Sequence, residues 1–198
     1  MKYATNDVSQ KILSSTFELL STHGYANVSM RDIAKKSGVA VSQITYYYKT
    51  KEQLLVHVIK KANQEYLSKL KQKLEGISTP NEKICFIFDW IEKLITEKTV
   101  LYRLLLDFYS LATWNEEIKK EFRAHFDESV SLLCENLKHI PLKNSSSDTH
   151  SYEQMAKLIA GASFGVAMQY VMDENNTDAV LSLRVMRDFF LDRFVQVY

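Results

Sequence analysis

The sequence predicts an all-α protein of about nine helices, with a three-helix head at the N-terminus and a larger helical body. Only 5 Gly and 2 Pro occur in 198 residues, so few turn formers are available for a many-stranded sheet. Long segments repeat apolar residues every three or four positions, which is the spacing of one face of a helix. The chain is also long enough to bury a core without disulfide staples.

The first two helices are indicated by their ends. A stripe of apolar residues from about 7 to 23 predicts the first helix, and Gly24 supplies a left-handed stop. Ser29 and Asp32 have the spacing of a capping box for a short second helix, which Gly38 ends. Two amphipathic helices are therefore expected before residue 40.

A third short helix, from about 41 to 48, follows after a tight turn. Ile44 and Tyr48 have the spacing of inward anchors, so the side chains around them are expected to point outward. Two helices joined by a tight Gly-containing turn form a helix-turn-helix, whose last helix fits the major groove of DNA. Gln, Ser and Thr can pair with base edges there, Val can touch a thymine methyl group, and Tyr and Lys can hold phosphates.

The same periodicity predicts the body. Its helices are expected at about 51–75, 80–98, 100–112, 115–138, 152–172 and 178–197, with a flexible loop at 141–150. Residues 1–60 hold eight Lys and Arg against four Asp and Glu, although the whole chain has a net charge of only +1. A basic head on an acidic body suits binding to a polyanion. We therefore expect a DNA-binding domain over 1–50. The features of the body described below lead us to expect a ligand-binding and dimerisation domain over 51–198.

The run GYANVSMRDIAKKSGVAVSQITYYYKTKEQLL resembles the signature of the TetR family of transcription repressors. The resemblance covers about residues 7–67 without a gap and consists of a GY-containing turn, a helix with IA followed by GV, and an aromatic cluster before Lys-Glu. The chain departs from the family at Ala40, Ser42 and Thr45, where a capping Ser, a Gly and an aromatic residue are usual. The resemblance implies a DNA-binding regulator, expected to be a repressor released from a palindromic operator by a small effector.

The resemblance also implies which residues contact DNA. Base or groove contacts are expected from Arg31, Val41, Ser42, Gln43, Thr45 and Tyr46, and phosphate contacts from Tyr47 and Lys51. Two alternatives stay open. The three consecutive tyrosines can be core aromatics of an ordinary bundle, and Lys35 and Lys36 can belong to a solvated face.

An effector site is expected in the aromatic segment 84–126. Aromatic side chains with a few polar groups suit an apolar or cationic guest. The predicted ligand-binding residues are Phe86, Trp90, Tyr102, Asp107, Phe108, Tyr109, Trp114 and Phe122. Asp107 can serve as a counter-charge for a cation, or it can pair with Arg103 one helical turn earlier. The aromatic residues can instead simply fill the core.

The last two helices predict a homodimer interface. The helix at 152–172 is dense in small residues, and the final helix carries a wide apolar stripe. Pairing both helices with a twofold copy gives a four-helix interface, which the resemblance also implies. The predicted interface residues are Ala160, Gly161, Phe164, Met168, Met186, Phe190 and Phe194. Packing within one chain is the alternative role for these residues.

No motif of an enzyme or a metal site is evident in the sequence. The five histidines show no HxxxH or HExxH spacing, and we find no phosphate loop or nucleophile beside a base. We therefore expect no catalytic or metal-binding residues, no enzymatic activity and no cofactor. A helical adaptor that binds other proteins is the alternative class, but a basic, groove-sized helix would serve no purpose in it.

The compartment is expected to be the reducing cytoplasm. Cys85 and Cys134 lack CxxC spacing and are predicted to be buried free thiols. The first residues contain no apolar signal segment, and no uncharged apolar run approaches the ~18 residues of a membrane span.

Overall fold

The computed structural model describes residues 2–138, 151–175 and 177–194, and the only regular secondary structure in those ranges is α-helix. This part of the chain forms nine helices: α1 (Lys2–His23), α2 (Met30–Ser37), α3 (Val41–Tyr48), α4 (Lys51–Glu75), α5 (Pro80–Glu97), α6 (Thr99–Trp114), α7 (Glu116–Leu137), α8 (Tyr152–Met172) and α9 (Thr177–Phe194). The all-α prediction is confirmed. The predicted loop at 141–150 and the predicted helix end at 197 lie outside the described residues.

Helix ends follow the capping residues of the sequence. The Thr79 hydroxyl accepts the backbone N–H of Glu82 at 3.3 Å, and α5 begins with Pro80, whose missing N–H costs nothing in the first turn. Asn115 caps α7, because its Oδ1 accepts the backbone N–H groups of Glu117 and Ile118 at 3.0 and 3.1 Å. The first helix is longer than predicted and begins at Lys2 instead of near residue 7.

The helices form two compact units. Unit 1 consists of Met1–Gln64 and Arg103–Arg123, and unit 2 consists of Glu65–Tyr102 and Ala124–Tyr198. The long helix α4 therefore contributes its first half to unit 1 and its second half to unit 2. The predicted functional division at residue 50 remains a prediction.

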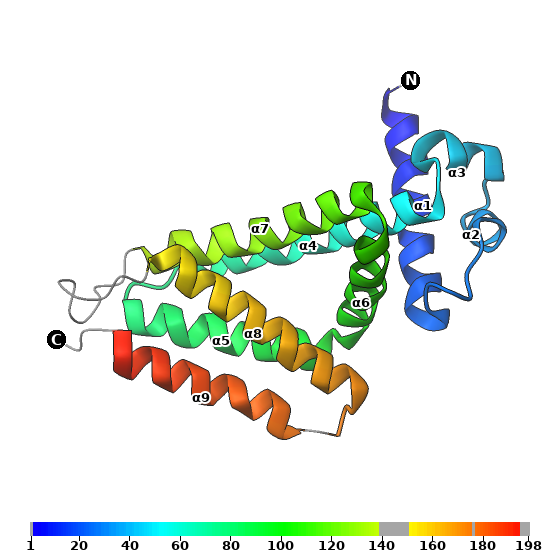
Figure 1. Ribbon diagram of the computed structural model, residues 1–198. Helices are drawn as coiled ribbons and strands as arrows, with labels where there is room; N and C mark the ends of the chain where they lie inside the picture. Colours follow the sequence, from blue (N-terminus) through cyan, green and yellow to red (C-terminus); the bar gives the residue numbers. More distant parts are fainter. Residues whose placement is uncertain (1, 139–150, 176, 195–198) are drawn as a thin grey trace. The chain divides into compact units, whose positions relative to one another are not determined.

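Unit 1 contains the three-helix head. Helix α2 packs against both α1 and α3 (Figure 1). The head is closed by apolar side chains with no more than 4% of their surface exposed, among them Ile12, Leu20, Ile33, Ile44 and Tyr48. The first half of α4 also packs in this unit, since Leu54 and Leu55 are fully buried.

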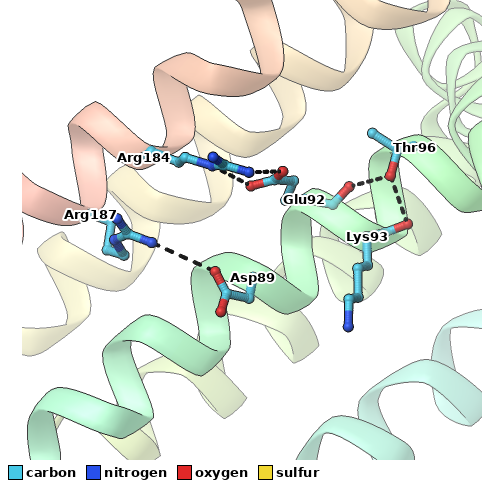
Figure 2. Close-up of polar contacts among 6 residues, drawn as sticks. All are labelled: Asp89, Glu92, Lys93, Thr96, Arg184 and Arg187. Carbon is cyan, nitrogen blue, oxygen red and sulfur yellow. Dashed lines mark hydrogen bonds and ion pairs between the residues drawn. The ribbon is translucent and has the colours of Figure 1, made fainter. Parts of the chain in front are cut away.

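Unit 2 is built on the packing of α5, α8 and α9, each against the other two (Figure 1). The rings of Phe88 on α5 and Phe190 on α9 lie 6.1 Å apart in its core. Figure 2 shows two ion pairs between α5 and α9. Arg184 donates two hydrogen bonds to Glu92 at 2.8 and 3.1 Å, and Arg187 lies 3.7 Å from Asp89. Apolar contact and surface charge thus hold α9 on α5.

One expectation about the body needs correction. Cys85 and Cys134 are free cysteines, as predicted, but both are half-buried rather than buried. Among the described residues, α8 alone is long and apolar enough to cross a membrane by length and composition. Lys157 interrupts its apolar run, so this helix does not contradict the expectation that the sequence has no uncharged apolar run of ~18 residues.

Candidate nucleic-acid interface

The helix-turn-helix of the head is fixed by its second helix. The Ser29 backbone N–H donates to the Asp32 carboxylate at 2.9 Å, and the Asp32 N–H donates to the Ser29 hydroxyl at 3.2 Å, so the predicted capping box is present. The Ser29 hydroxyl also donates to the Asp32 carboxylate, and this bond together with the one from the Ser29 backbone N–H lowers the pKa of Asp32. Gly38 ends the helix with φ of 63°, a left-handed conformation that glycine adopts without strain.

The start of α3 is capped in an unexpected way. Ala40 occupies the N-cap position and has no side-chain acceptor. The Gln43 side chain supplies the reciprocal half of a capping box, because its Oε1 accepts the backbone N–H of Ala40 at 3.1 Å. The Gln43 N–H, which a Ser at position 40 would accept, donates to the Ala40 carbonyl at 3.0 Å instead.

One side of α3 is exposed. Ile44 and Tyr48 point into the head as predicted, and the rest of α3 is exposed except for the half-buried Tyr47. We call the exposed side the recognition face; it consists of Val41, Ser42, Gln43, Thr45 and Tyr46. Tyr46 is 81% exposed, which is unusual for an aromatic side chain. Arg31, in the first turn of α2, is exposed as well.

The three consecutive tyrosines have different environments. Tyr48 is a core residue, and its hydroxyl lies 2.7 Å from that of Ser9 on α1. Tyr47 is half-buried, and its ring meets that of Tyr46 edge to face at 5.3 Å. The core alternative thus holds for Tyr48 only, and the predicted DNA contacts of Tyr46 and Tyr47 stay predictions on accessible side chains.

The turn from α3 to α4 is strained. Lys49 has φ of 54°, and the backbone N–H of Thr50 donates to the carbonyl of Tyr48 at 2.5 Å. A residue with a Cβ adopts this conformation at a cost of about 1–3 kcal/mol, so neighbouring contacts must hold the turn.

Lys51 supplies contacts of that kind. Its ammonium donates to the backbone carbonyls of Tyr25 and Val28, both at 2.8 Å, and lies 3.9 Å from the centre of the Tyr25 ring. These bonds tie the start of α4 to the turn between α1 and α2. They use two of the three ammonium N–H groups. A phosphate contact of Lys51, which remains a prediction, would have to use the third or the backbone amides of the first turn of α4.

Tyr25 links the head to α6 within unit 1. Its hydroxyl donates to Glu52 at 2.9 Å, and its backbone N–H donates to the Asp107 carboxylate at 3.4 Å. Burial and the hydrogen bond to Glu52 raise the pKa of Tyr25, and burial raises the pKa of Asp107. Sequence reasoning missed this connection because it depends on a backbone N–H that lies 82 residues from its acceptor.

The predicted effector residues fall into two clusters. In unit 1, the Phe122 ring lies 5.3 Å from Phe108 and 5.5 Å from Tyr109, and Phe108 is fully buried. In unit 2, Phe86 and Trp90 lie 5.9 Å apart, and Tyr102 is buried. Trp114 is 91% exposed at the end of α6 and joins neither cluster. A role in effector binding stays a prediction for all of these residues and for Asp107.

Most of the predicted dimer residues do not lie on the exposed sides of α8 and α9. Phe190 is 2% exposed and packs on Phe88, so its accessible position was a wrong expectation: α9 turns this ring toward α5. Ala160, Phe164, Met168 and Met186 are half-buried, Gly161 is exposed, and the Phe194 side chain lies outside the described residues.

Other apolar side chains occupy that exposed side. The α8–α9 outer face consists of the exposed residues Leu158, Met172, Leu181, Val185 and Phe189. On α9 these residues recur every four positions, which places them on one side of the helix. The sequence signal for this side of α9 is a second apolar stripe that contains Val185 and Phe189. It is offset by one residue from the predicted stripe of Met186 and Phe190.

Residues 12–58 match the family model described as bacterial regulatory proteins of the tetR family. An uncharacterized HTH-type transcriptional regulator in the dhlA 5' region of Xanthobacter autotrophicus is 23% identical over 143 residues, which are 71% of this chain and 69% of that protein.

Two solved structures share the fold. A transcriptional regulator from Saccharomonospora viridis in complex with choline aligns with a TM-score of 0.77 and 16% identity, over 97% of this chain and all of that one. FadR from Bacillus subtilis in complex with stearoyl-CoA aligns with a TM-score of 0.73 and 19% identity, over 90% of this chain and 95% of that one.

A capped helix-turn-helix with one exposed polar and aromatic face defines a DNA-binding transcriptional regulator. The match to the family model lies on the same helices that form this site. Over residues 12–58, which carry this site, the chain matches the TetR family of regulators. This class is favoured over the helical adaptor.

Proposed function

We propose that the chain is a cytoplasmic repressor that binds a palindromic operator as a homodimer and leaves it when a small apolar or cationic effector binds. The observation that carries the DNA-binding part is the recognition face, which presents accessible polar groups and one exposed aromatic ring on a helix sized for the major groove. In this proposal the recognition face and Arg31 contact bases, and Tyr47 and Lys51 contact phosphates.

The proposed dimer uses the α8–α9 outer face. Five exposed apolar side chains lie on α8 and α9, which pack against each other, and apolar groups exposed in this way favour burial against a partner. A twofold copy of the same face would bury all of them in a four-helix contact. The proposed interface uses the two helices predicted from the sequence, but Phe189 takes the place of the predicted Phe190.

The proposed effector response depends on α6. Phe108 and Tyr109 on α6 pack with Phe122 on α7, and Asp107 on α6 bonds to the Tyr25 backbone in the head. A guest that moves these aromatic rings would therefore move a helix that is hydrogen-bonded to the head. The two structures with choline and stearoyl-CoA support a small cation or an acyl compound as the guest.

The first experiment is a mobility-shift series at fixed salt with the DNA that flanks the gene and with a scrambled duplex. We expect the flanking DNA to bind at least about a thousandfold more tightly than the scrambled one. Tyr47→Phe and Lys51→Ala should weaken binding to both duplexes alike, and Lys36→Ala, which removes an exposed lysine of the head, is the control. Because Lys51→Ala also removes the bonds to Tyr25 and Val28, its thermal melting is measured beside its binding. Equal binding to both duplexes by the unmodified protein would contradict the repressor proposal.

The second experiment titrates choline and stearoyl-CoA with and without operator. A coupling of about 1–3 kcal/mol changes operator affinity roughly 5–150-fold and changes ligand affinity by the same factor. Asp107→Asn should reduce the coupling without abolishing ligand binding if the path runs through Tyr25. A ligand that binds equally well with and without operator would show that no coupling exists.

A further inference from the structure

We propose that Gln43 acts on DNA as a hydrogen-bond donor only, and that it therefore selects guanine at one position of each half-site. The inference deepens the proposed function, because it assigns a base preference to one residue of the recognition face.

The acceptor of the Gln43 amide is already engaged. Its Oε1 accepts the backbone N–H of Ala40 at 3.1 Å, while the Gln43 backbone N–H donates to the Ala40 carbonyl at 3.0 Å. The bond to the Ala40 N–H therefore joins the Gln43 side chain to the residue that begins α3. A capping hydrogen bond of this kind is lost if the side chain rotates away to place Oε1 on a base.

The other end of the amide remains for DNA. The Nε2 atom carries two N–H donors, and Gln43 is exposed at the N-terminal end of α3, the part of a recognition helix that meets base edges. Oε1 keeps a second lone pair, but the bond to Ala40 holds this oxygen beside the start of α3, so the side chain presents its two donors to the groove.

The four bases respond differently to such a group. Adenine is normally read by an amide that donates to N7 and accepts from N6, which requires the Oε1 that Ala40 occupies. Cytosine offers only a donor on its major-groove edge. Thymine offers one acceptor, O4, beside its methyl group, whereas guanine offers two acceptors, O6 and N7, and no donor. Guanine can therefore pair with both N–H donors of the amide. It is therefore the base that best matches a glutamine capped in this way.

Thr45 has the opposite character on the same helix. Its hydroxyl donates to the Val41 carbonyl at 2.8 Å, so its oxygen is left to accept. Thr45→Val removes the oxygen and keeps the shape of the side chain. That variant is the matched control, since it should alter the preference at a different position and leave the guanine in place.

The experiment is a selection from randomised duplexes with the full-length protein and its Gln43→Glu, Gln43→Ala and Thr45→Val variants. A glutamate at this position keeps an acceptor for the Ala40 N–H, suits the positive end of the helix dipole and has no donor. We expect the unmodified protein to enrich guanine at one position of each half-site by about five- to tenfold. Gln43→Glu should replace that guanine by cytosine on the same strand, and Gln43→Ala should lose the preference.

Thermal melting separates the base preference from folding. Gln43→Glu should melt at or above the temperature of the unmodified protein, and Gln43→Ala should melt below it. Enrichment of adenine, or an unchanged motif in Gln43→Glu, would overturn the inference and leave the regulator intact. A protein that enriches no sequence at all would overturn the proposed function together with it.

Discussion

The exposed side of α3 is polar and aromatic, whereas α8 and α9 each expose large apolar side chains among their polar residues. Gln43 and Thr45 on the recognition face have hydrogen-bonding groups partly engaged with their own helix. On the α8–α9 outer face, Val185 is 70% exposed and Phe189 56% exposed. Polar groups with some capacity left suit a wet groove with a fixed donor and acceptor pattern. Apolar groups gain only from removing water, which a second protein surface does.

The contrast is sharpest at two adjacent phenylalanines. Successive residues of a helix point about 100° apart, so Phe190 faces the core and Phe189 the solvent, with 2% and 56% of their surfaces exposed. Phe190→Ala should therefore lower the free energy of unfolding by about 3–5 kcal/mol through the cavity that it leaves. Phe189→Ala should change the free energy of unfolding of the single chain, measured below the concentration at which it dimerises, by less than about 0.5 kcal/mol. Urea unfolding of both variants measures the difference. Similar losses in the two would abolish the distinction between the faces.

The outer face can be tested by a charge. Phe189→Asp should leave each chain folded and weaken self-association by at least about thirtyfold, because a carboxylate would have to be buried at the centre of the contact. Sedimentation at several concentrations reports the change, and Phe189→Leu is the control that keeps an apolar group. A Phe189→Asp protein that still dimerises as the unmodified chain does would place the interface elsewhere.

The burial of His125 in unit 2 can be tested by measuring the free energy of unfolding at several pH values. Burial lowers the pKa of His125 to about 4, from 6.5. Between these values the unfolded chain binds the proton and the folded chain does not, so the free energy of unfolding falls as the pH drops from about 6.5 to about 4. We expect this histidine to contribute a loss of about 2 kcal/mol between pH 7 and pH 5. His125→Gln should remove that part of the pH dependence in thermal melts.

The smallest effect on stability is expected from the solvent-exposed ion pair of Arg184 and Glu92. Arg184→Ala removes the two hydrogen bonds to Glu92 that join α9 to α5 (Figure 2). Because the pair is solvent-exposed, the melting temperature should hardly change. A large drop would mean that ionic contacts, more than the packing of Phe190 on Phe88, hold α9 in place.

Local signals predicted much of the fold. The Ser29–Asp32 box, Gly38 and Thr79-Pro80 each act within one helical turn, so the ends of α2 and the start of α5 follow from the sequence. The recognition face was predictable because α3 buries a single stripe, and Ile44 and Tyr48 fix its rotation.

The sequence failed where a helix has two apolar sides or where a contact is distant. On α9, apolar residues occupy the buried and the exposed side, and their pattern does not indicate which side faces α5. The bonds from Lys51 to the carbonyls of Tyr25 and Val28 depend on backbone atoms more than twenty residues away, for which residue type gives no signal.

Two glycines on the outer side of α8 bear on the lifetime of the regulator in the cell. A Cβ added at Gly161 or Gly165 would meet nothing within 4 Å, so alanine would fit at both positions in the single chain. Glycine inside a helix is less stable than alanine by about 1 kcal/mol, so the two together forgo about 2 kcal/mol in the lone subunit. In a dimer that brings another backbone against these positions, close contact offsets the loss. Subunits diluted below the dimer threshold would then unfold and be degraded first, which makes the persistence of the protein depend on its own abundance.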